Sequence, residues 1–296
     1  MRISAIIPTR GRFDSLCRTL DSVRKQRFPG GIQLVVVDDA SDPPLPPLPA
    51  DVRLVQLATQ SGACAARNAG VRVAEGEFLL FMDDDAELLN PDDITTAIAW
   101  FEERPKLGAV GFRQLTPDRQ VHYMQPAAGD VPVVTGVFFS YTCIVRRSVY
   151  EKVGGFNEAF GYYFEEVELS LKLHAAGYDI IYDPDLAVIH YQDDRHRDWT
   201  RIHRLSTRNA LMGYLLHYPA WMLLALFIKR LYQFARITGR TVPGRSDLWW
   251  LVRELAVRRS YLRANRHPFR RGTIREFHNR CRNALSVARA LPREER

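Results

Sequence analysis

The chain has 296 residues, of which 46% are hydrophobic and 25% charged, a composition that excludes disorder along its whole length. Its net charge of +7 hides an asymmetry: residues 1–194 hold 18 Lys and Arg against 28 Asp and Glu, whereas residues 195–296 hold 23 against 6. An acidic first part and a basic second part indicate two regions with different partners. The four cysteines are widely spaced and form no CxxC pair, which argues against a disulfide scaffold and a cysteine-based zinc site.

Predicted strands and helices alternate through the first third of the chain. Apolar, β-branched runs predict strands at residues 3–7, 32–37, 52–57 and 77–82. Helical spacing of apolar residues predicts helices at residues 13–26, 61–74 and 91–103. The proline-rich segment 42–50 can be neither helix nor central strand. This alternation predicts an open, largely parallel α/β sheet, in which ligands bind beyond the carboxyl ends of the strands.

The middle of the chain, from about residue 107 to residue 191, mixes short strands with two helices. The helices are predicted at residues 148–153 and 165–176, and two strands at residues 179–182 and 187–190. From residue 195 onward the sequence becomes helix-rich and rich in arginine.

Two features of the sequence bear on where the protein acts. The apolar run at residues 3–7 is too short for a signal peptide, which predicts a cytoplasmic protein. Residues 209–228 contain no Asp, Glu, Lys or Arg, although Asn209, His217 and Pro219 interrupt them. Three interpretations stay open for this segment: a transmembrane helix, a helix lying in the membrane interface, or a surface packed into the protein's own core or a dimer interface.

The arginines of the basic region suggest a partner. Arg204, Arg208 and later arginine pairs could meet anionic lipid head groups or a polyprenyl-phosphate acceptor on the inner face of a plasma membrane. The charge also suits nucleic acid electrostatically, but no recognition motif accompanies it, so we do not expect a nucleic-acid partner.

Two predicted strands end in clusters of carboxylates. Asp83, Asp84 and Asp85 follow the fourth strand, and Asp38 and Asp39 follow the second. Three adjacent carboxylates repel one another unless a cation offsets their charge, and oxygen ligands suit Mg²⁺ or Mn²⁺. An acid pair at a strand end can accept hydrogen bonds from a nucleotide base or ribose. Each cluster taken alone also fits an ordinary solvated turn.

Three further motifs carry side chains that could bind a ligand or take part in catalysis. Arg67 and Asn68 lie on a helix that begins with small residues and could face a diphosphate. Glu165 and Glu166 begin a helix and could supply a general base at the mouth of a pocket. The aromatic residues expected to line that pocket are Phe156, Tyr162, Tyr163 and Phe164. His190 ends an apolar strand and could join the acidic cluster as a metal ligand.

In combination and in this order, the motifs resemble the family 2 glycosyltransferases. The chain reads strand–PTR, strand–DDxS, GxxxxRNxG, strand–DDD, GGFxE, EExEL and strand–H along about 190 residues. The resemblance covers roughly residues 2–210 and implies the GT-A fold, a mixed and mostly parallel central sheet flanked by helices. It implies a catalytic domain at residues 1–194, with its acceptor part from about residue 107. Residues 195–296 would form a helical, basic extension.

The resemblance implies roles for individual residues. Those expected to bind the nucleotide sugar are Pro8, Thr9, Arg10, Asp38, Asp39, Arg67, Asn68, Asp83 and Asp84. Those expected to hold a divalent metal, Mn²⁺ or Mg²⁺, are Asp83, Asp85 and His190. The pair Glu165-Glu166 matches the family's usual Glu-Asp pair, whose second member is the catalytic base. That member is Glu166 here, one methylene longer than Asp, and the choice between Glu166 and Glu165 stays open.

The implied reaction is inverting transfer of a hexosyl or deoxyhexosyl group from a nucleoside diphosphate sugar to an acceptor hydroxyl. The acceptor would be a glycan, a lipid-linked or polyprenyl-linked saccharide, or a small molecule, in cell-envelope or polysaccharide biosynthesis. A homodimer through the apolar segment stays open. One alternative is a catalytically degenerate scaffold that binds sugar nucleotides. Another is a sugar-1-phosphate nucleotidyltransferase, which would normally show a glycine-rich first loop that this chain lacks.

Overall fold

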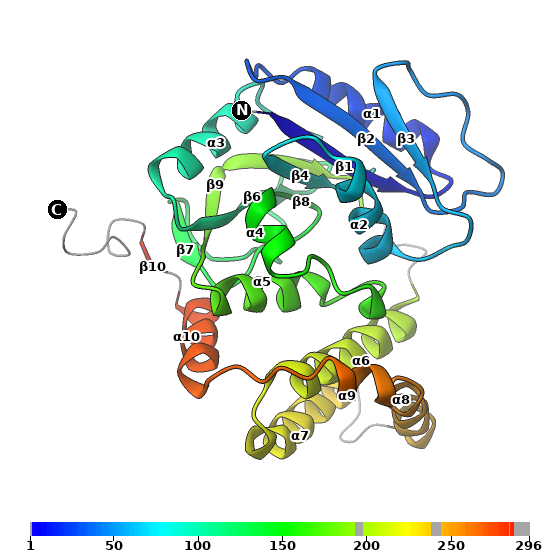
Figure 1. Ribbon diagram of the computed structural model, residues 1–296, viewed down its shortest axis with the longest axis vertical. Helices are drawn as coiled ribbons and strands as arrows, with labels where there is room; N and C mark the ends of the chain where they lie inside the picture. Colours follow the sequence, from blue (N-terminus) through cyan, green and yellow to red (C-terminus); the bar gives the residue numbers. More distant parts are fainter. Residues whose placement is uncertain (1, 193–197, 238–243, 284, 287–296) are drawn as a thin grey trace.

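The computed structural model describes residues 2–192, 198–237, 244–283 and 285–286 (Figure 1). Its centre is a ten-stranded sheet in the order β10-β7-β9-β6-β8-β4-β1-β2-β3, with β5 paired to β9 off this path. The sheet is flanked by helices, and further helices follow it in the chain. This is the mixed, mostly parallel α/β architecture that the sequence predicts.

The first part of the sheet is parallel. Its strands are β1 (Ile3–Thr9), β2 (Ile32–Asp38), β3 (Val52–Gln56) and β4 (Phe78–Met82). The helices that connect or follow them are α1 (Phe13–Arg24), α2 (Ala63–Val73) and α3 (Asp93–Glu103). Strand β4 is buried throughout because α1 and α3 pack on one face of the sheet and α2 on the other. The predicted elements of this part are confirmed, with ends shifted by a few residues.

The second part of the sheet mixes strand directions. Its elements are β5 (Ala86–Leu88), β6 (Leu107–Leu115), β7 (Val133–Thr135), β8 (Thr142–Arg146), α4 (Arg147–Lys152), a 3₁₀ turn (Glu158–Phe160), α5 (Glu165–Ala175) and β9 (Asp179–His190). Strand β8 runs antiparallel to both β4 and β6, and β6 runs parallel to β9. Helix α5 shares the α2 face of the sheet.

Strand β9 corrects one prediction. The sequence predicts two strands, at residues 179–182 and 187–190, but they form one continuous strand. The pairing with β6 skips three residues, because Phe112 pairs with Asp183 and the next residue pairs with Ala187. Pro184 lies in this bulge, where its missing N–H breaks no ladder hydrogen bond. A bulge therefore carries the strand past a proline that sequence reasoning treats as a break.

The C-terminal part is helical, as expected. It comprises α6 (Trp199–His217), α7 (Ala220–Ile237), α8 (Arg245–Val257), α9 (Arg259–Ala264), α10 (Arg271–Arg282) and β10 (Leu285–Ser286). Helices α6–α9 form a layer beyond α5, and β10 returns to pair with β7 (Figure 1). The predicted boundary between residues 194 and 195 lies outside the described residues.

The apolar segment 209–228 is divided between two helices. It breaks at Tyr218 and Pro219, where α6 has ended and α7 has not begun. The α6 half is buried, with Met212 and Leu216 packed against the α2 face of the sheet. The α7 half leaves Trp221, Leu224 and Ile228 more than 60% exposed. Among the described residues, no helix combines the length and apolar character that a membrane span needs.

Two arginines expected to face lipid form ion pairs with carboxylates of the same chain. Arg204 pairs with Asp247 of α8 at 2.6 Å, and Arg208 is buried and pairs with Glu254 of α8 at 3.0 Å. The sequence alone does not indicate these pairs, because the carboxylates, about 45 positions away, reach α6 only once α8 folds against it. Carboxylates of α8 therefore offset the charge of both arginines, which gives no support to a membrane contact at these two residues.

Candidate active site

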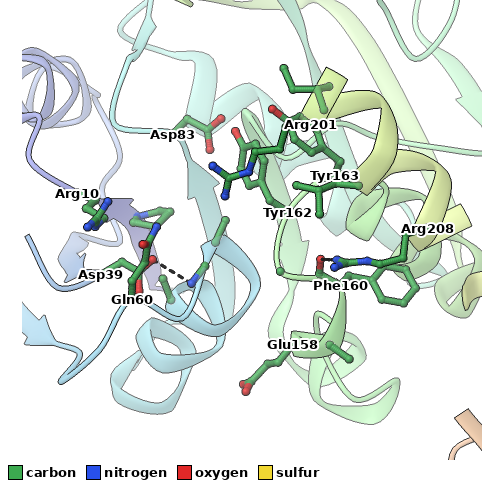
Figure 2. A pocket seen from close by; sticks show the side chains of 18 of the residues that line it. Arg10, Asp39, Gln60, Asp83, Glu158, Phe160, Tyr162, Tyr163, Arg201 and Arg208 are labelled. Carbon is green, nitrogen blue, oxygen red and sulfur yellow. Dashed lines mark hydrogen bonds between the residues drawn. The ribbon is translucent and has the colours of Figure 1, made fainter. Parts of the chain in front are cut away.

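A cleft of about 790 Å³ opens where β1, β2 and β4 end (Figure 2). The sheet side of the cleft is lined by Pro8, Thr9, Arg10, Arg12, Asp39 and Asp83. The opposite wall comes from residues 158–163 and from α6, which contributes Arg201, Ile202, Leu205 and Arg208. The site thus lies beyond the carboxyl ends of the parallel strands, as predicted, and the C-terminal region supplies one of its walls.

The acid pair at the end of β2 is held by backbone N–H groups. Asp39 accepts hydrogen bonds from the amides of Ser61, at 2.6 Å, and Gly62, at 2.9 Å, just before α2. Asp38 accepts from the amide and hydroxyl of Ser41. Asp39 therefore presents an oriented carboxylate to the cleft, whereas Asp38 is buried in an Asx-type turn and does not line it.

The predicted metal ligands converge. Asp83, Asp85 and His190 place one ligand atom each within 4.8 Å of one another. Nε2 of His190 lies 2.9 Å from Oδ1 of Asp85 and 3.8 Å from Oδ2 of Asp83. The sheet brings them together, because Ala86 of β5 pairs directly with His190 at the end of β9. Two carboxylates and an imidazole are a ligand set that fits Mn²⁺ or Mg²⁺ with phosphate oxygens completing the shell.

Asp84 points away from this cluster. It is fully buried, and its Oδ2 accepts hydrogen bonds from Thr9, at 2.6 Å, and from Nε of Arg12, at 3.1 Å. Burial raises the pKa of Asp84 to about 7, although Arg12 and Thr9 oppose that shift. A turn at residues 83–86 separates the Asp84 side chain from those of Asp83 and Asp85. Asp84 does not line the cleft.

Arg12 is a functional candidate that sequence reasoning missed. Its guanidinium spans Asp84 and Asp85, with Nη1 at 2.7 Å from Oδ2 of Asp85, and it lines the cleft. Burial raises the pKa of Asp85, but the hydrogen bond from His190 and the charges of His190 and Arg12 outweigh it and lower the value to about 2. The signal available in the sequence is the place of Arg12, two residues beyond Arg10 at the same strand end.

Arg67 links the candidate metal site, through Asp83, to the two glutamates at the start of α5. It is almost fully buried; Nη2 donates to Oδ1 of Asp83 at 2.7 Å, and Nη1 donates to Oε1 of Glu165 at 3.2 Å. Burial lowers the pKa of Arg67, but these two carboxylates raise it above its ordinary value, so the group stays charged. Arg67 does not itself line the cleft.

The side chain of Asn68 forms hydrogen bonds that hold the loop at residues 154–158. Its Nδ2 donates to the carbonyl of Phe156 and to Oε1 of Glu158, each at 2.9 Å, and its Oδ1 accepts from the hydroxyl of Tyr150. These bonds fix the GGFNE segment at residues 154–158, and neither Asn68 nor Phe156 lines the cleft. The assignment of Arg67 and Asn68 as direct ligands of a nucleotide sugar stays a prediction.

The two glutamates at the start of α5 have different surroundings. Glu165 is buried against Arg67, whereas Glu166 is partly exposed. The partial burial of Glu166 and the neighbouring Glu165 carboxylate nevertheless raise the pKa of Glu166 well above its ordinary value. Neither carboxylate lines the cleft described above, although Tyr162 and Tyr163, just before them, do.

Two residues outside the predicted set complete the surroundings of the cluster. Gln114 of β6 lies with Nε2 3.0 Å from Nδ1 of His190, and the ring of Tyr141 stacks on His190. A partner on Nδ1 fixes the ring orientation of a metal-binding histidine and so directs Nε2 toward the aspartates. No local sequence motif marks Gln114, because only the pairing of β6 with β9 brings it to His190.

The model of the family described as Glycosyl transferase family 2 matches residues 4–159. The chain belongs to glycosyl transferase family 2. It is 28% identical over 228 residues to the O-antigen biosynthesis protein RfbC of Myxococcus xanthus, covering 66% of this chain and 18% of RfbC. It is 26% identical over 228 residues to the uncharacterized protein y4gI of Sinorhizobium fredii, covering 64% and 24%. The chain thus spans at most about a quarter of the length of these two relatives.

Solved structures agree on the fold. TarS 1–349 of S. aureus in complex with UDP-GlcNAc matches with a TM-score of 0.57 at 22% identity, covering 81% of this chain and 75% of that one. The mannosyltransferase PcManGT from Pyrobaculum calidifontis, in complex with GDP-Man and Mn²⁺, matches with a TM-score of 0.59 at 20% identity, covering 88% and 75%. The GT-A fold that the sequence predicts is confirmed.

The cluster predicts a metal-dependent gain in stability. Mn²⁺ should raise the melting temperature of the wild-type protein, and EDTA should reverse the rise, because ligands that bind only the folded state stabilise it. Asp85→Asn should weaken Mn²⁺ binding at least about tenfold, since it removes charge and a ligand oxygen. Glu158→Gln changes an exposed carboxylate that also lines the cleft and should leave Mn²⁺ binding unchanged. Equal loss in both variants would contradict the assignment.

Proposed function

We propose that the chain transfers a sugar from a nucleoside diphosphate sugar to an acceptor hydroxyl, with inversion at the anomeric carbon. The observation that carries the proposal is the convergence of Asp83, Asp85 and His190 beside a cleft, with Arg67 linking Asp83 to Glu165. The bound states of two structural neighbours support it, since one contains UDP-GlcNAc and the other GDP-Man and Mn²⁺.

The donor would lie on the sheet side of the cleft. Pro8 and Thr9 end β1 there and Arg10 follows them, and Asp39 offers an oriented carboxylate to a base or ribose. Asp83, Asp85 and His190 would hold Mn²⁺ or Mg²⁺, which supplies positive charge that stabilises the departing diphosphate. Arg12 and Arg201 also line the cleft, and their guanidinium groups can pair with phosphate oxygens.

The start of α5 would provide the base. Glu166 would accept the proton of the acceptor hydroxyl as its oxygen bonds to the anomeric carbon and the bond to the diphosphate breaks. A carboxylate whose pKa is raised toward the working pH is a stronger base than an ordinary glutamate. Glu165, paired with Arg67, would keep its negative charge beside Glu166 and so maintain that raised pKa.

The acceptor is proposed to be a saccharide, free or linked to a lipid or polyprenyl carrier, presented at an anionic membrane surface. The support comes from α7, where Trp221, Leu224 and Ile228 form an exposed apolar stripe on a helix without acidic residues. Lys229 and Arg236 are exposed on the same helix, a combination typical of helices that lie in a membrane interface. Pairing of this stripe with a second copy, as a homodimer, is the competing arrangement.

The proposal is tested by nucleoside diphosphate release from a panel of uridine, thymidine and guanosine diphosphate sugars. Each donor is assayed with Mn²⁺, Mg²⁺ or EDTA, and with or without detergent-dispersed lipid extract. We expect release from one donor, loss of release in EDTA, and stimulation by the extract. Absence of release together with absence of any metal-dependent thermal shift by nucleotides would favour the degenerate scaffold.

The base assignment predicts a separation of chemistry from binding. Glu166→Gln should lower kcat by about 10²–10⁴-fold, because it removes the proton acceptor while keeping size and hydrogen bonding. The affinity for nucleoside diphosphate with Mn²⁺, measured by calorimetry, should stay at the wild-type value. Glu165→Gln, the same substitution at the neighbouring glutamate, is the variant with which Glu166→Gln is compared. Near-normal turnover in Glu166→Gln would transfer the role to Glu165 or to another group.

The raised pKa of Glu166 predicts how kcat falls on the acid side of the pH profile. A base must be deprotonated to act, and the pKa of Glu166 is raised by burial and by Glu165. Transfer should therefore be high at alkaline pH and fall as pH decreases through a value well above that of an ordinary glutamate. Glu165→Gln should move this limb to lower pH, since it removes the neighbouring negative charge. The measurement is kcat against pH at saturating donor and acceptor.

A further inference from the structure

The segment that precedes α5 has an unfavourable backbone conformation. Tyr163 and Phe164 have φ of +71° and +70°, and Gly161 has φ of +70°. The left-handed region costs little for glycine but is disfavoured for aromatic residues, so such a conformation persists only where surrounding groups hold it. Tyr162 and Tyr163 line the cleft, and Glu165 and Glu166 follow directly. Whatever holds this segment therefore sets the position of the reacting groups.

The carbonyls of four successive residues in this segment accept hydrogen bonds from outside it. The amide of Cys64 in α2 donates to the carbonyl of Gly161 at 3.2 Å. The side-chain amide of Asn209 in α6 lies 3.0, 2.9 and 2.6 Å from the carbonyls of Phe160, Tyr162 and Tyr163. The side-chain amide of one Asn thus lies within hydrogen-bond distance of three carbonyls of a strained turn.

A second α6 residue orients that amide. Nε of Arg208 donates to Oδ1 of Asn209 at 2.9 Å, which directs the NH₂ group toward the segment. Nη2 of Arg208 donates to the carbonyl of Phe160 at 2.8 Å (Figure 2), and Nη1 pairs with Glu254 of α8. A chain of polar contacts therefore runs from α8 through Arg208 and Asn209 to the segment.

The burial of the pair argues against incidental packing. Asn209 is 0% exposed and Arg208 is 6% exposed. A buried amide or guanidinium is costly unless its donors are satisfied, and an apolar side chain would serve helix packing alone. Within the described part of the chain, every hydrogen-bond acceptor of the Asn209 amide nitrogen belongs to this one segment. The amide of Asn209 therefore serves the backbone that leads into α5, and Arg208 contacts the same backbone while it pairs with Glu254.

We infer that Arg208 and Asn209 are positioning residues for sugar transfer: they hold residues 160–164 in the conformation that directs Tyr162 and Tyr163 into the cleft and fixes the start of α5. This inference rests on the proposed function. It makes the C-terminal helical region part of the catalytic apparatus, in addition to any role in locating the protein. The nucleotide side of the cleft, built on β1, β2 and β4, does not depend on the pair.

The test separates kcat from donor binding. Asn209→Ala should lower kcat by about 10²-fold, the loss typical of a displacement of about 1 Å in a catalytic site. The affinity for nucleoside diphosphate with Mn²⁺ should stay within about twofold of wild type, since Pro8, Asp39 and Asp83 are untouched. Arg204→Gln is the matched control, because it removes an ion pair between α6 and α8 without contacting the segment. It should retain wild-type kcat.

A second measurement follows the segment itself and needs no turnover. Amide hydrogen exchange of Asn209→Ala should accelerate in peptides covering residues 161–166, with exchange in β1 and β4 unchanged, and Arg204→Gln should show no such acceleration. Should Asn209→Ala fail to fold, Arg208→Lys, which keeps the charge but loses the planar donor fork, should show the same pattern more weakly.

The outcomes distinguish this inference from the proposed function. Wild-type kcat in Asn209→Ala, or unchanged exchange at residues 161–166, would overturn the positioning role while leaving the transferase intact. Parallel losses in kcat and nucleotide affinity would reduce the pair to a structural role. Absence of turnover in the wild-type protein with every donor would overturn the proposed function, and the exchange measurement would still decide whether the pair holds the segment.

Discussion

The buried guanidinium of Arg67 is the interaction on which the rest of the site depends. It contacts Asp83 of the metal cluster and Glu165 of α5, groups that lie 82 positions apart in the sequence. Breaking a buried ion pair by removing one partner typically costs about 3–5 kcal/mol, because the remaining charge is left uncompensated. Arg67 therefore ties together the two acidic regions that the proposed reaction needs, one for the leaving group and one for the proton.

The other acidic groups of the site are also offset by nearby cationic or hydrogen-bonding side chains. Arg12 offsets Asp84 and Asp85, and His190 shares a hydrogen bond with Asp85. The three consecutive aspartates thus diverge: Asp83 faces Arg67, Asp85 faces His190 and Arg12, and Asp84 turns inward to Thr9. A run of like charges is tolerated because each member has at least one cationic or hydrogen-bonding partner.

The C-terminal helices are integrated with the sheet-bearing part of the chain. Helix α6 supplies one wall of the cleft and contacts the segment before α5, and β10 returns to the sheet beside β7. The basic charge of this region is consequently divided. Arg204 and Arg208 serve contacts within the protein, whereas Lys229 and Arg236 of α7 stay exposed on the helix that carries the apolar stripe. A count of charges along the sequence does not distinguish these two uses.

The sequence by itself determined the alternation of strands and helices in the first third, the acidic clusters at strand ends, and the family. These features are local, since runs of apolar residues and the residues that follow them can be recognised without knowing their neighbours in space. Only the tertiary structure decided that β9 is continuous past Pro184, that Arg12 and Gln114 contact the candidate metal ligands, and that Arg208 and Asn209 hydrogen-bond the backbone before α5. Each of these depends on contacts between residues far apart in the chain, and strand pairing and helix packing, which no local pattern encodes, create those contacts.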